Sequence, residues 1–520
     1  MLVPLGVLDN HLEEIGTCLA FVVQAGENWT VEDKAAFVER LEGATERVVR
    51  KWTLLQGLPK KLENGSWAID VPDEPPTDRK LYDLTTATTP KPYHVVAGAS
   101  SPLPPLSSAS SGYLPNPLPS LFRSPTSPIT NTDYAKKRLP LLHVHVTVLA
   151  DAFAVGVSVP HGLFDGGGTG LVVRALDAEL HGRPWPFEIP PLFSLVEGNP
   201  MTRILDSLVD DPAVPQDEVV LPARWLPWQT SKVLHLLGFL LTLVVERLWW
   251  KSEGRCIFLR RKAVDVLVER AKQEVKATNG GSEYVSEADV VGAWLFQSAH
   301  QNEASTNGEV ASSILMSLRP LLAEYATQTG LSAYPFDQYP FNTSLPFDIF
   351  PASLGAPVSD FVSTPLAEAA LLFRRGLLAH RSTSMVKTIW ARVREMSTFE
   401  WQLHWMREWA DLPTFLRRLF PFLPGARDPP RTRWIVSNQC FLGIGDLHFP
   451  SPRKEDDGKD LPLVAFHMFS VLAFEQINTF NLQAPPDRVG VTVIAFMRRS
   501  RWASFDKALE ELERRAVEAE

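Results

Sequence analysis

The sequence contains very little cysteine and no excess of positive charge. Its 520 residues include only three cysteines, Cys18, Cys256 and Cys440, which lie far apart and form no C-x-x-C pair. This spacing excludes an obvious zinc site or redox pair, and it favours a reducing compartment. The formal net charge of −9 argues against a nucleic-acid-binding protein, which would normally carry a basic stripe.

Long apolar runs are also missing. The N-terminal stretch has no basic region followed by an apolar core, so we expect no signal peptide and a cytoplasmic protein. The most apolar segment, 233–250, is uninterrupted only from Leu236 to Val245, whereas a spanning helix needs about 20 apolar residues. Two interpretations remain: a buried or domain-bridging helix, or a peripheral helix in the membrane interface with Trp249 and Trp250 at headgroup level.

Several catalytic motifs are absent. There is no G-x-S-x-G elbow, no H-E-x-x-H helix, and no Walker lysine after "GGGTG". His143 and His145 would share one face of a strand, but no carboxylate or cysteine lies near them in the sequence. We therefore expect structural histidines and no metal site.

Alternating strand and helix patterns predict an α/β protein in two halves of similar size. We expect an N-terminal domain over residues 1–225, an apolar connection over 226–255 and a C-terminal domain over 256–520. Residues 73–128 are rich in Pro and Ser, which predicts a long extended surface loop, partly disordered, without strands or helices. The clearest elements are a helix over 31–52, strands over 65–72, 142–149 and 153–160, a helix ending near Gly182, and a helix capped by Ser286.

One stretch, "SVPHGLFDGGGTG" (158–170), carries the strongest chemical pattern. Pro160 ends a strand, so His161 is exposed where the chain turns into a glycine-rich helix entry. A histidine titrates near neutral pH and is the usual base for removing a proton from a hydroxyl or amine. A charged Asp165 buried in this turn needs a partner, for which arginine is the natural choice. The alternative is that both residues only shape the turn.

The order of motifs along the chain resembles a known family. H-x-x-x-D-G, here His161 to Gly166, resembles the signature of the BAHD acyltransferases, which share the chloramphenicol-acetyltransferase-like fold with fungal trichothecene-type acetyltransferases. "VPLGVLDN", "GSWAIDVP", "YVSEADVVGAWLF", "LMSLRP" and the closing "GVTVIAFMRRSRWASFDKALEEL" resemble further segments of the family in the same order. The resemblance implies two such domains, each a mixed β-sheet with flanking helices, and an active site in the tunnel between them.

The resemblance also implies roles for individual residues. His161 would be the general base that deprotonates an acceptor hydroxyl or amine, which then attacks a coenzyme A thioester. Asp165 would pair with Arg319 in "LMSLRP" and hold the loop, and Gly166 would keep the channel clear. The expected partners are an acyl-CoA co-substrate, acetyl-CoA above all, and a small alcohol acceptor such as a fungal terpenoid; we expect a monomer with no bound cofactor.

One family motif is degenerate. The second motif, Asp-Phe-Gly-Trp-Gly, should follow "WIVSNQCFLGIGDL", but His448, Phe449 and Pro450 stand where Asp-Phe-Gly would lie. This departure leaves a noncatalytic relative of the same fold as an alternative. Amide formation, by an N-acyltransferase or a condensation-type enzyme, is a second alternative. Condensation domains usually carry two histidines, and Pro160 precedes His161 here, which disfavours that branch.

Overall fold

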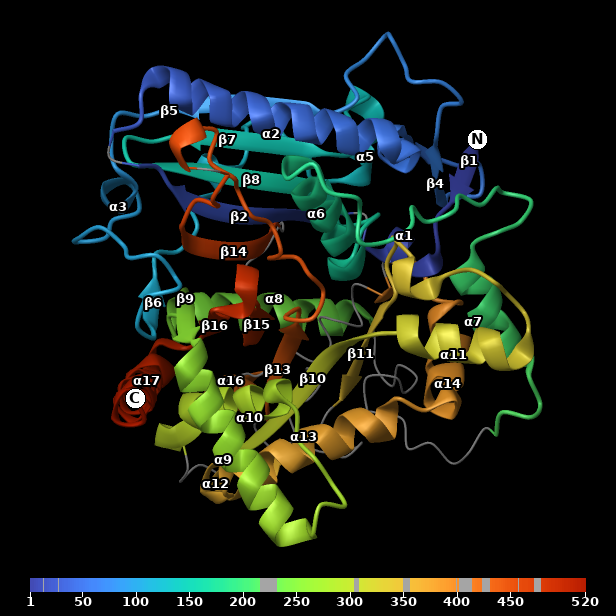
Figure 1. The fold of residues 1–520 in the computed structure, drawn as a ribbon. Helices are drawn as coiled ribbons and strands as arrows, with labels where there is room; N and C mark the ends of the chain where they lie inside the picture. The colour runs from blue at the N-terminus through green and yellow to red at the C-terminus, as the bar shows by residue number, and fades with distance from the viewer. Residues whose placement is uncertain are drawn as a thin grey trace.

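The computed structural model describes residues 1–520 except 13, 27, 216–231, 304–307, 349–355, 399, 402–413, 423–430, 457 and 472–477. Two large mixed sheets lie one above the other, and helices cover their outer faces (Figure 1). A small antiparallel sheet joins β1 (Leu2–Pro4), β4 (Trp67–Asp70) and β3 (Leu58–Lys61). The fold is thus α/β with two sheet-centred halves, as the sequence predicts.

The first large sheet has five strands. Their order is β14 (Leu463–Val471), β2 (Gly16–Gln24), β8 (Ala152–Pro160), β7 (His143–Val148) and β5 (Asp83–Thr88), antiparallel except for the last pair. Every residue of β8 is buried, because α2 (Val31–Lys51) covers one face and the segment around α4 (Pro119–Phe122) covers the other. On α2, a capping box starts the helix at Thr30, and Phe37 stacks on Phe153 of β8 with ring centroids 4.0 Å apart.

The second large sheet has eight strands. Seven follow the order β11 (Ser344–Asp348), β10 (Glu309–Ser317), β13 (Arg431–Asn438), β15 (Thr479–Gln483), β16 (Gly490–Met497), β9 (Glu253–Arg260) and β6 (Gly112–Leu114), and β12 (Ala356–Pro357) pairs with β10. The helices around it are α9 (Arg261–Asn279), α10 (Glu287–His300), α13 (Leu366–His380) and α17 (Arg499–Glu518). As predicted, Ser286 caps α10. Their apolar faces form a second core around stacked Trp434 and Phe480.

Further helices lie around and between the sheets. They are α1 (Val7–His11), α3 (Tyr93–Val96), α5 (Asn131–Lys137), α6 (Gly166–Leu180), α7 (Pro200–Asp210), α8 (Lys232–Leu248), α11 (Arg319–Thr329), α12 (Val358–Ser363), α14 (Thr383–Val393) and α16 (Thr414–Leu419). The helix α6 packs against α2, while α11 and α14 pack against α7. In the described part of the chain, none of the helices is both long enough and apolar enough to cross a membrane.

The expectation of a long unstructured loop over 73–128 is wrong. Strand β5 pairs in parallel with β7, and β6 pairs with β9 of the other large sheet. Residues 83–88 and 112–114 contain no proline, so their backbone N–H groups can pair with a neighbouring strand. Both strands lie at the edge of a sheet, where only one side of the strand needs a partner. Conversely, strand β14 comes from the C-terminal part of the chain and pairs with β2 in the N-terminal sheet. The predicted boundary at residue 225 lies outside the described residues.

Candidate active site

His161 lies where β8 ends, before the first turn of α6. Its backbone N–H donates to the Ile15 carbonyl at 3.0 Å, and its own carbonyl accepts from Nδ2 of Asn342 at 2.8 Å. The side chain is half-buried, and Nδ1 is buried with no hydrogen-bond partner in the described part of the chain. Burial lowers the pKa of His161, although its own carbonyl, Asp165 and Asn342 oppose that shift. The ring is therefore neutral at neutral pH.

Asp165 and Arg319, which the resemblance pairs, are in contact. The guanidinium Nη1 lies 2.9 Å from Asp165 Oδ2, and Nη2 lies 2.6 Å from Oδ1. Asp165 also caps α6 by accepting from the Gly168 N–H at 3.0 Å. Burial alone raises the pKa of Asp165, but Arg319 and the Gly168 and Thr343 N–H groups together hold it below its usual value. The ionised carboxylate thus ties the histidine loop to the other half of the molecule.

Arg319 does not lie within a strand. It is the first residue of α11, and Leu318 separates it from the end of β10 at Ser317. The helix can begin here because Pro320 suits its first turn. Its guanidinium also donates to the carbonyls of Tyr339 and Phe341 at 2.8 and 2.9 Å. Residues 339–343 thus hold the guanidinium of Arg319 through their carbonyl groups. In the same segment, Thr343 donates its N–H to Asp165 at 3.1 Å.

Four glycines of the motif meet close neighbours. A Cβ on Gly166 would lie 2.5 Å from the Leu442 side chain, and one on Gly167 would lie 2.6 Å from Arg319 Nη1. A Cβ on Gly168 would lie 1.8 Å from the Pro340 carbonyl oxygen, and one on Gly170 would lie 1.9 Å from that of Leu442. Backbone atoms cannot yield as a side-chain end can, so Gly168 and Gly170 are constrained more strongly than Gly166. The resemblance had pointed only to Gly166.

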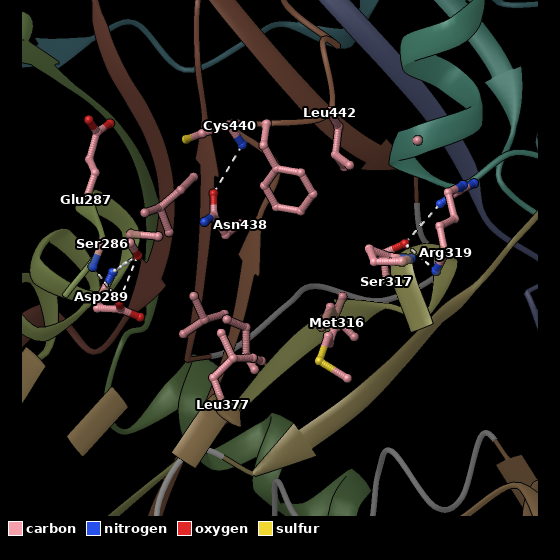
Figure 2. A pocket seen from close by; sticks show the side chains of 18 of the residues that line it. Ser286, Glu287, Asp289, Met316, Ser317, Arg319, Leu377, Asn438, Cys440 and Leu442 are labelled. Carbon is pink, nitrogen blue, oxygen red and sulfur yellow. Dashed lines mark hydrogen bonds between the residues drawn. The ribbon is translucent and has the colours of Figure 1, made fainter. Parts of the chain in front are cut away.

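A cavity of about 870 Å³ lies between the two halves. Figure 2 shows Arg319 and Leu442 on one side of it and the N-terminus of α10 on the other. The α6 residues Gly167, Leu171 and Arg174 line it from the N-terminal half. The cavity thus has walls from both halves. His161 is not among the lining residues; its loop reaches the cavity through Gly167.

Some of the charged side chains that line the cavity have a partner of opposite charge, and others do not. The acids at the start of α10 are paired, since Asp289 accepts from Arg374 Nε at 2.8 Å and Glu287 accepts from Arg261 at 2.9 Å. Three other lining arginines, Arg174, Arg381 and Arg488, have no carboxylate within ion-pair distance among the described residues. Arg174 donates to a backbone carbonyl and lies over the Phe187 ring. Asp337 also lines the cavity, but the three arginines outnumber it. The cavity therefore offers positive charge to an anionic ligand, although the whole chain is acidic.

The degenerate second motif lies beside this cavity and does not line it. His448 donates its backbone N–H to Asp177 Oδ1 of α6 at 2.9 Å, and its ring nitrogens contact Asp177 and Asp487 at 3.0 and 3.2 Å. The hydrogen bond to Asp177 is the main cause that raises the pKa of His448 to about 9. Phe449 is buried against Phe21 and Phe37. The charged His448 thus holds the loop after β13 against α6. Phe441 and Leu442 of this loop line the cavity.

Other predicted features have structural explanations. His143 contacts Asp83 Oδ2 at 3.4 Å, and His145 contacts the Thr85 hydroxyl at 2.7 Å, both across the β5–β7 pair. Within the described residues there is no group of three or more His, Cys, Asp or Glu that could hold a metal.

Sequence reasoning missed two residues that bear directly on His161. Asn342 and the buried Asp9 belong to the same hydrogen-bonded group as the histidine loop. Asp9 stands in "VPLGVLDN", a segment the resemblance had included without giving it a role. Asn342 has no motif around it, and only the fold brings it near His161.

Comparisons with known proteins give partial sequence matches. No protein-family model matches the chain. The O-acyltransferase pboC of Aspergillus ustus is 31% identical over 183 residues, 34% of each chain, and the acetyltransferase BOT5 of Botryotinia fuckeliana is 28% identical over 33% of this chain and 30% of its own. The transcriptional regulator calD of Penicillium decumbens is 24% identical over 53% of this chain and 51% of its own. The chain thus spans about half or less of the curated relatives it matches.

Solved structures match along almost the whole chain. TRI101 of F. sporotrichioides, in a complex with coenzyme A and T-2, has a TM-score of 0.55 at 14% identity and covers 96% of both chains. Vinorine synthase has a TM-score of 0.50 at 13% identity, covering 98% of this chain and 93% of its own. These likenesses establish that the chain has the two-domain, chloramphenicol-acetyltransferase-like fold that its motifs predict.

Proposed function

We propose that the protein is an acyl-CoA-dependent O-acyltransferase acting on a hydroxyl of a small natural product, a fungal terpenoid in the simplest case. One arrangement carries this proposal. A neutral histidine lies at the end of a strand, and the buried ion pair between Asp165 and Arg319 connects its loop to a cavity with walls from both halves. The sequence matches to an O-acyltransferase and an acetyltransferase support the same class of reaction. TRI101, one of the solved structures with the same fold, was in complex with coenzyme A.

The reaction follows from the state of His161. Because Nδ1 is buried, Nε2 is the nitrogen that acts. It takes the proton from the acceptor hydroxyl as the oxygen attacks the thioester carbonyl. The tetrahedral intermediate then collapses, the C–S bond breaks, and the coenzyme A sulfur receives the proton from the imidazolium. The products are an ester and free coenzyme A, and no electron acceptor is required.

The charge around the cavity supports an anionic donor. An acyl-CoA carries several phosphate charges, and guanidinium groups bind phosphates by charge-assisted hydrogen bonds. Arg174, Arg381 and Arg488 line the cavity without carboxylate partners among the described residues, so they are placed to serve this purpose. One chain supplies both walls of the cavity, which supports activity as a monomer.

A transfer assay tests the proposal. Purified protein is incubated with acetyl-CoA labelled in the acyl group and separate panels of terpenoid alcohols and primary amines. Label in an ester product is the expected result. Label in amides would favour the N-acyltransferase alternative. Tight binding of acyl-CoA with no transfer to any acceptor would contradict the proposal and favour a noncatalytic relative, an alternative that the match to a transcriptional regulator keeps in view.

We also propose that α8 rests on a membrane surface. The residues at helical spacing on its outer face are apolar and strongly exposed, with 64% for Val233, 51% for Leu237, 47% for Leu240, 52% for Val244 and 71% for Leu248. Trp249, 65% exposed, follows directly. Flotation with neutral lipid vesicles should carry the wild type upward and leave a Leu240→Glu, Val244→Glu variant behind. Equal flotation of both would refute the assignment.

A further inference from the structure

Residues 484–489, the β15–β16 turn, contain two successive residues with left-handed backbone conformations. The φ angles are 56° for Asp487 and 50° for Arg488, and the described part of the chain has no other consecutive non-glycine pair with positive φ. Aspartate adopts this conformation more readily than most residues, but for arginine it costs free energy. Arg488 nevertheless lines the cavity. The surrounding structure must therefore hold the turn in the conformation that places Arg488 there.

The loop after β13 provides contacts that hold this turn. The two backbones lie against each other, since a Cβ on Gly445 would be 2.0 Å from the carbonyl oxygen of Ala484. Further along the loop, the ring of His448 contacts the left-handed pair directly. Its Nε2 lies 3.2 Å from Oδ1 of Asp487, the residue before Arg488.

The other ring nitrogen of His448 contacts α6. Its Nδ1 lies 3.0 Å from Oδ1 of Asp177, which follows Arg174 by three residues on the same face of the helix. Both partners of the ring are carboxylates, which only accept, and a neutral histidine has a single ring N–H to donate. Only the imidazolium can donate to both. As a cation, the ring thus joins two elements that each carry an arginine of the cavity.

We infer that His448 is a positioning residue for the acyl-CoA site, because its imidazolium joins the turn that carries Arg488 to the helix that carries Arg174. This inference rests on the proposed function, in which arginines of the cavity bind the phosphates of the donor. His448 does not line the cavity and touches no ligand in this scheme. When its ring loses a proton, one of the two contacts breaks, and the strained turn can relax and withdraw Arg488. Affinity for the donor should then fall.

The charges in contact with His448 set the pH at which this happens. The hydrogen bond to Asp177 is the main cause that raises the pKa of His448 to about 9, and Asp487 adds to it, while burial opposes both. The bridge is therefore complete near neutral pH and is lost as pH rises through about 9. Cys440 also lines the cavity, but burial raises the pKa of its thiol to about 12, so it keeps its proton over this range.

Three further charged groups lie near the ring. His181 has its ring centroid 6.3 Å from that of His448, and its Nε2 lies 2.9 Å from Asp460. Arg183 lies 2.7 Å from the same α6 carboxylate that His448 contacts. In the described part of the chain, none of the three has a hydrogen bond or ion pair with the β15–β16 turn. His181→Gln is therefore a matched control, which alters the same cluster without reaching the turn.

Calorimetry with S-ethyl-coenzyme A tests the inference, because this thioether has no thiol to ionise. We expect Kd of the wild type to rise about fivefold or more between about pH 7.5 and about pH 10. His448→Gln should bind about as weakly at the lower pH as the wild type does at the higher one, with little further change. His181→Gln should keep the pH dependence of the wild type. A Kd independent of pH in the wild type, or an equal rise in His448→Gln, would overturn the inference.

A second variant covers the case in which His448→Gln does not fold. Asp487→Gly removes a carboxylate whose side chain is 75% exposed, and glycine suits the left-handed position, so the protein should fold normally. It should weaken binding at neutral pH and abolish the pH dependence. Adding Asp487→Gly to His448→Gln should cause no further loss of affinity. Additive losses would show that His448 does not act through the turn.

Turnover measurements separate this inference from the proposed function. In an active enzyme, His448→Gln should raise KM for acyl-CoA and change kcat by less than about twofold. The expected binding results without acyl transfer to any acceptor would support the inference, and the proposed function would fail alone. Transfer with a donor affinity that does not depend on His448 would overturn the inference and leave the proposed function standing. A protein that binds no S-ethyl-coenzyme A at any pH would contradict both.

Discussion

Asp165→Asn tests how far the ion pair between the halves holds the histidine loop. The substitution keeps an oxygen that can cap α6 but removes the charge opposite Arg319. Asp165 is 3% exposed and Arg319 is 7% exposed, so the guanidinium would remain as an uncompensated buried charge. Breaking a buried pair in this way costs about 3–5 kcal/mol. The expected loss is at this level in the apparent free energy of unfolding.

Urea unfolding followed by tryptophan fluorescence measures this loss, with Glu283→Gln as the matched control. Glu283 pairs with Arg375 on the surface, where the side chains are 34% and 53% exposed, so water and salt screen the pair and its loss should change stability little. Asp165→Asn with Arg319→Met removes both charges and should be less destabilised than Asp165→Asn alone. A loss in Asp165→Asn no greater than in Glu283→Gln would refute the reasoning.

The same pair predicts a pH dependence. The folded pKa of Asp165 lies below the unfolded value of about 3.9, so its stabilisation is present above that pH and is lost as pH falls through the folded pKa. The stability difference between wild type and Asp165→Asn should therefore shrink only under strongly acid conditions. A difference that already vanishes near pH 6 would contradict an ionised, paired Asp165.

Three further predictions follow from the surroundings of the cavity. Gly168→Ala should yield little folded protein on expression, because its Cβ would lie 1.8 Å from a backbone carbonyl, whereas Gly238→Ala on α8 meets nothing within 4 Å and should fold normally. His448 has a folded pKa of about 9, raised by Asp177, so its stabilisation is complete below about pH 6.5 and is lost as pH rises through 9. Melting temperatures across pH 6–10 should accordingly fall more in the wild type than in His448→Gln, and parallel curves would exclude this role. Arg488→Ala should raise KM for acyl-CoA several-fold and leave KM for the acceptor unchanged. The control is Lys276→Ala, at an exposed position away from the cavity. Equal KM values for acyl-CoA in the two variants would show that Arg488 does not bind the donor.

Much of the fold was predictable because local signals agree with the tertiary structure. The capped, amphipathic α2, the β7–β8 hairpin and α10 with its N-cap at Ser286 are all formed as expected. The edge strands β5 and β6 were missed because their Pro- and Ser-rich surroundings hide short pairing segments. No local pattern shows that strand β14 pairs with β2, which lies more than 400 positions earlier in the sequence.

The candidate site was predictable only where residues lie in motifs. His161, Asp165 and Arg319 stand in recognisable segments, and the structure brings the last two into contact over 154 positions of sequence. Their roles in catalysis remain predictions. Asn342 stands in no recognisable motif, because only the fold brings its side-chain amide to Asp9 and to the His161 carbonyl. His448 stands where the family motif has an aspartate, and its charged ring contacts Asp177. A motif comparison detects only the missing aspartate and does not reveal this contact.

The central claim is that the imidazole of His161 removes the proton from the acceptor. The most direct test is the single-turnover rate of acyl transfer by His161→Gln, with acyl-CoA affinity measured separately by calorimetry. We expect the rate to fall by about 10²–10⁴ while donor affinity stays within a few-fold of wild type. A variant that transfers the acyl group at the wild-type rate would contradict the account.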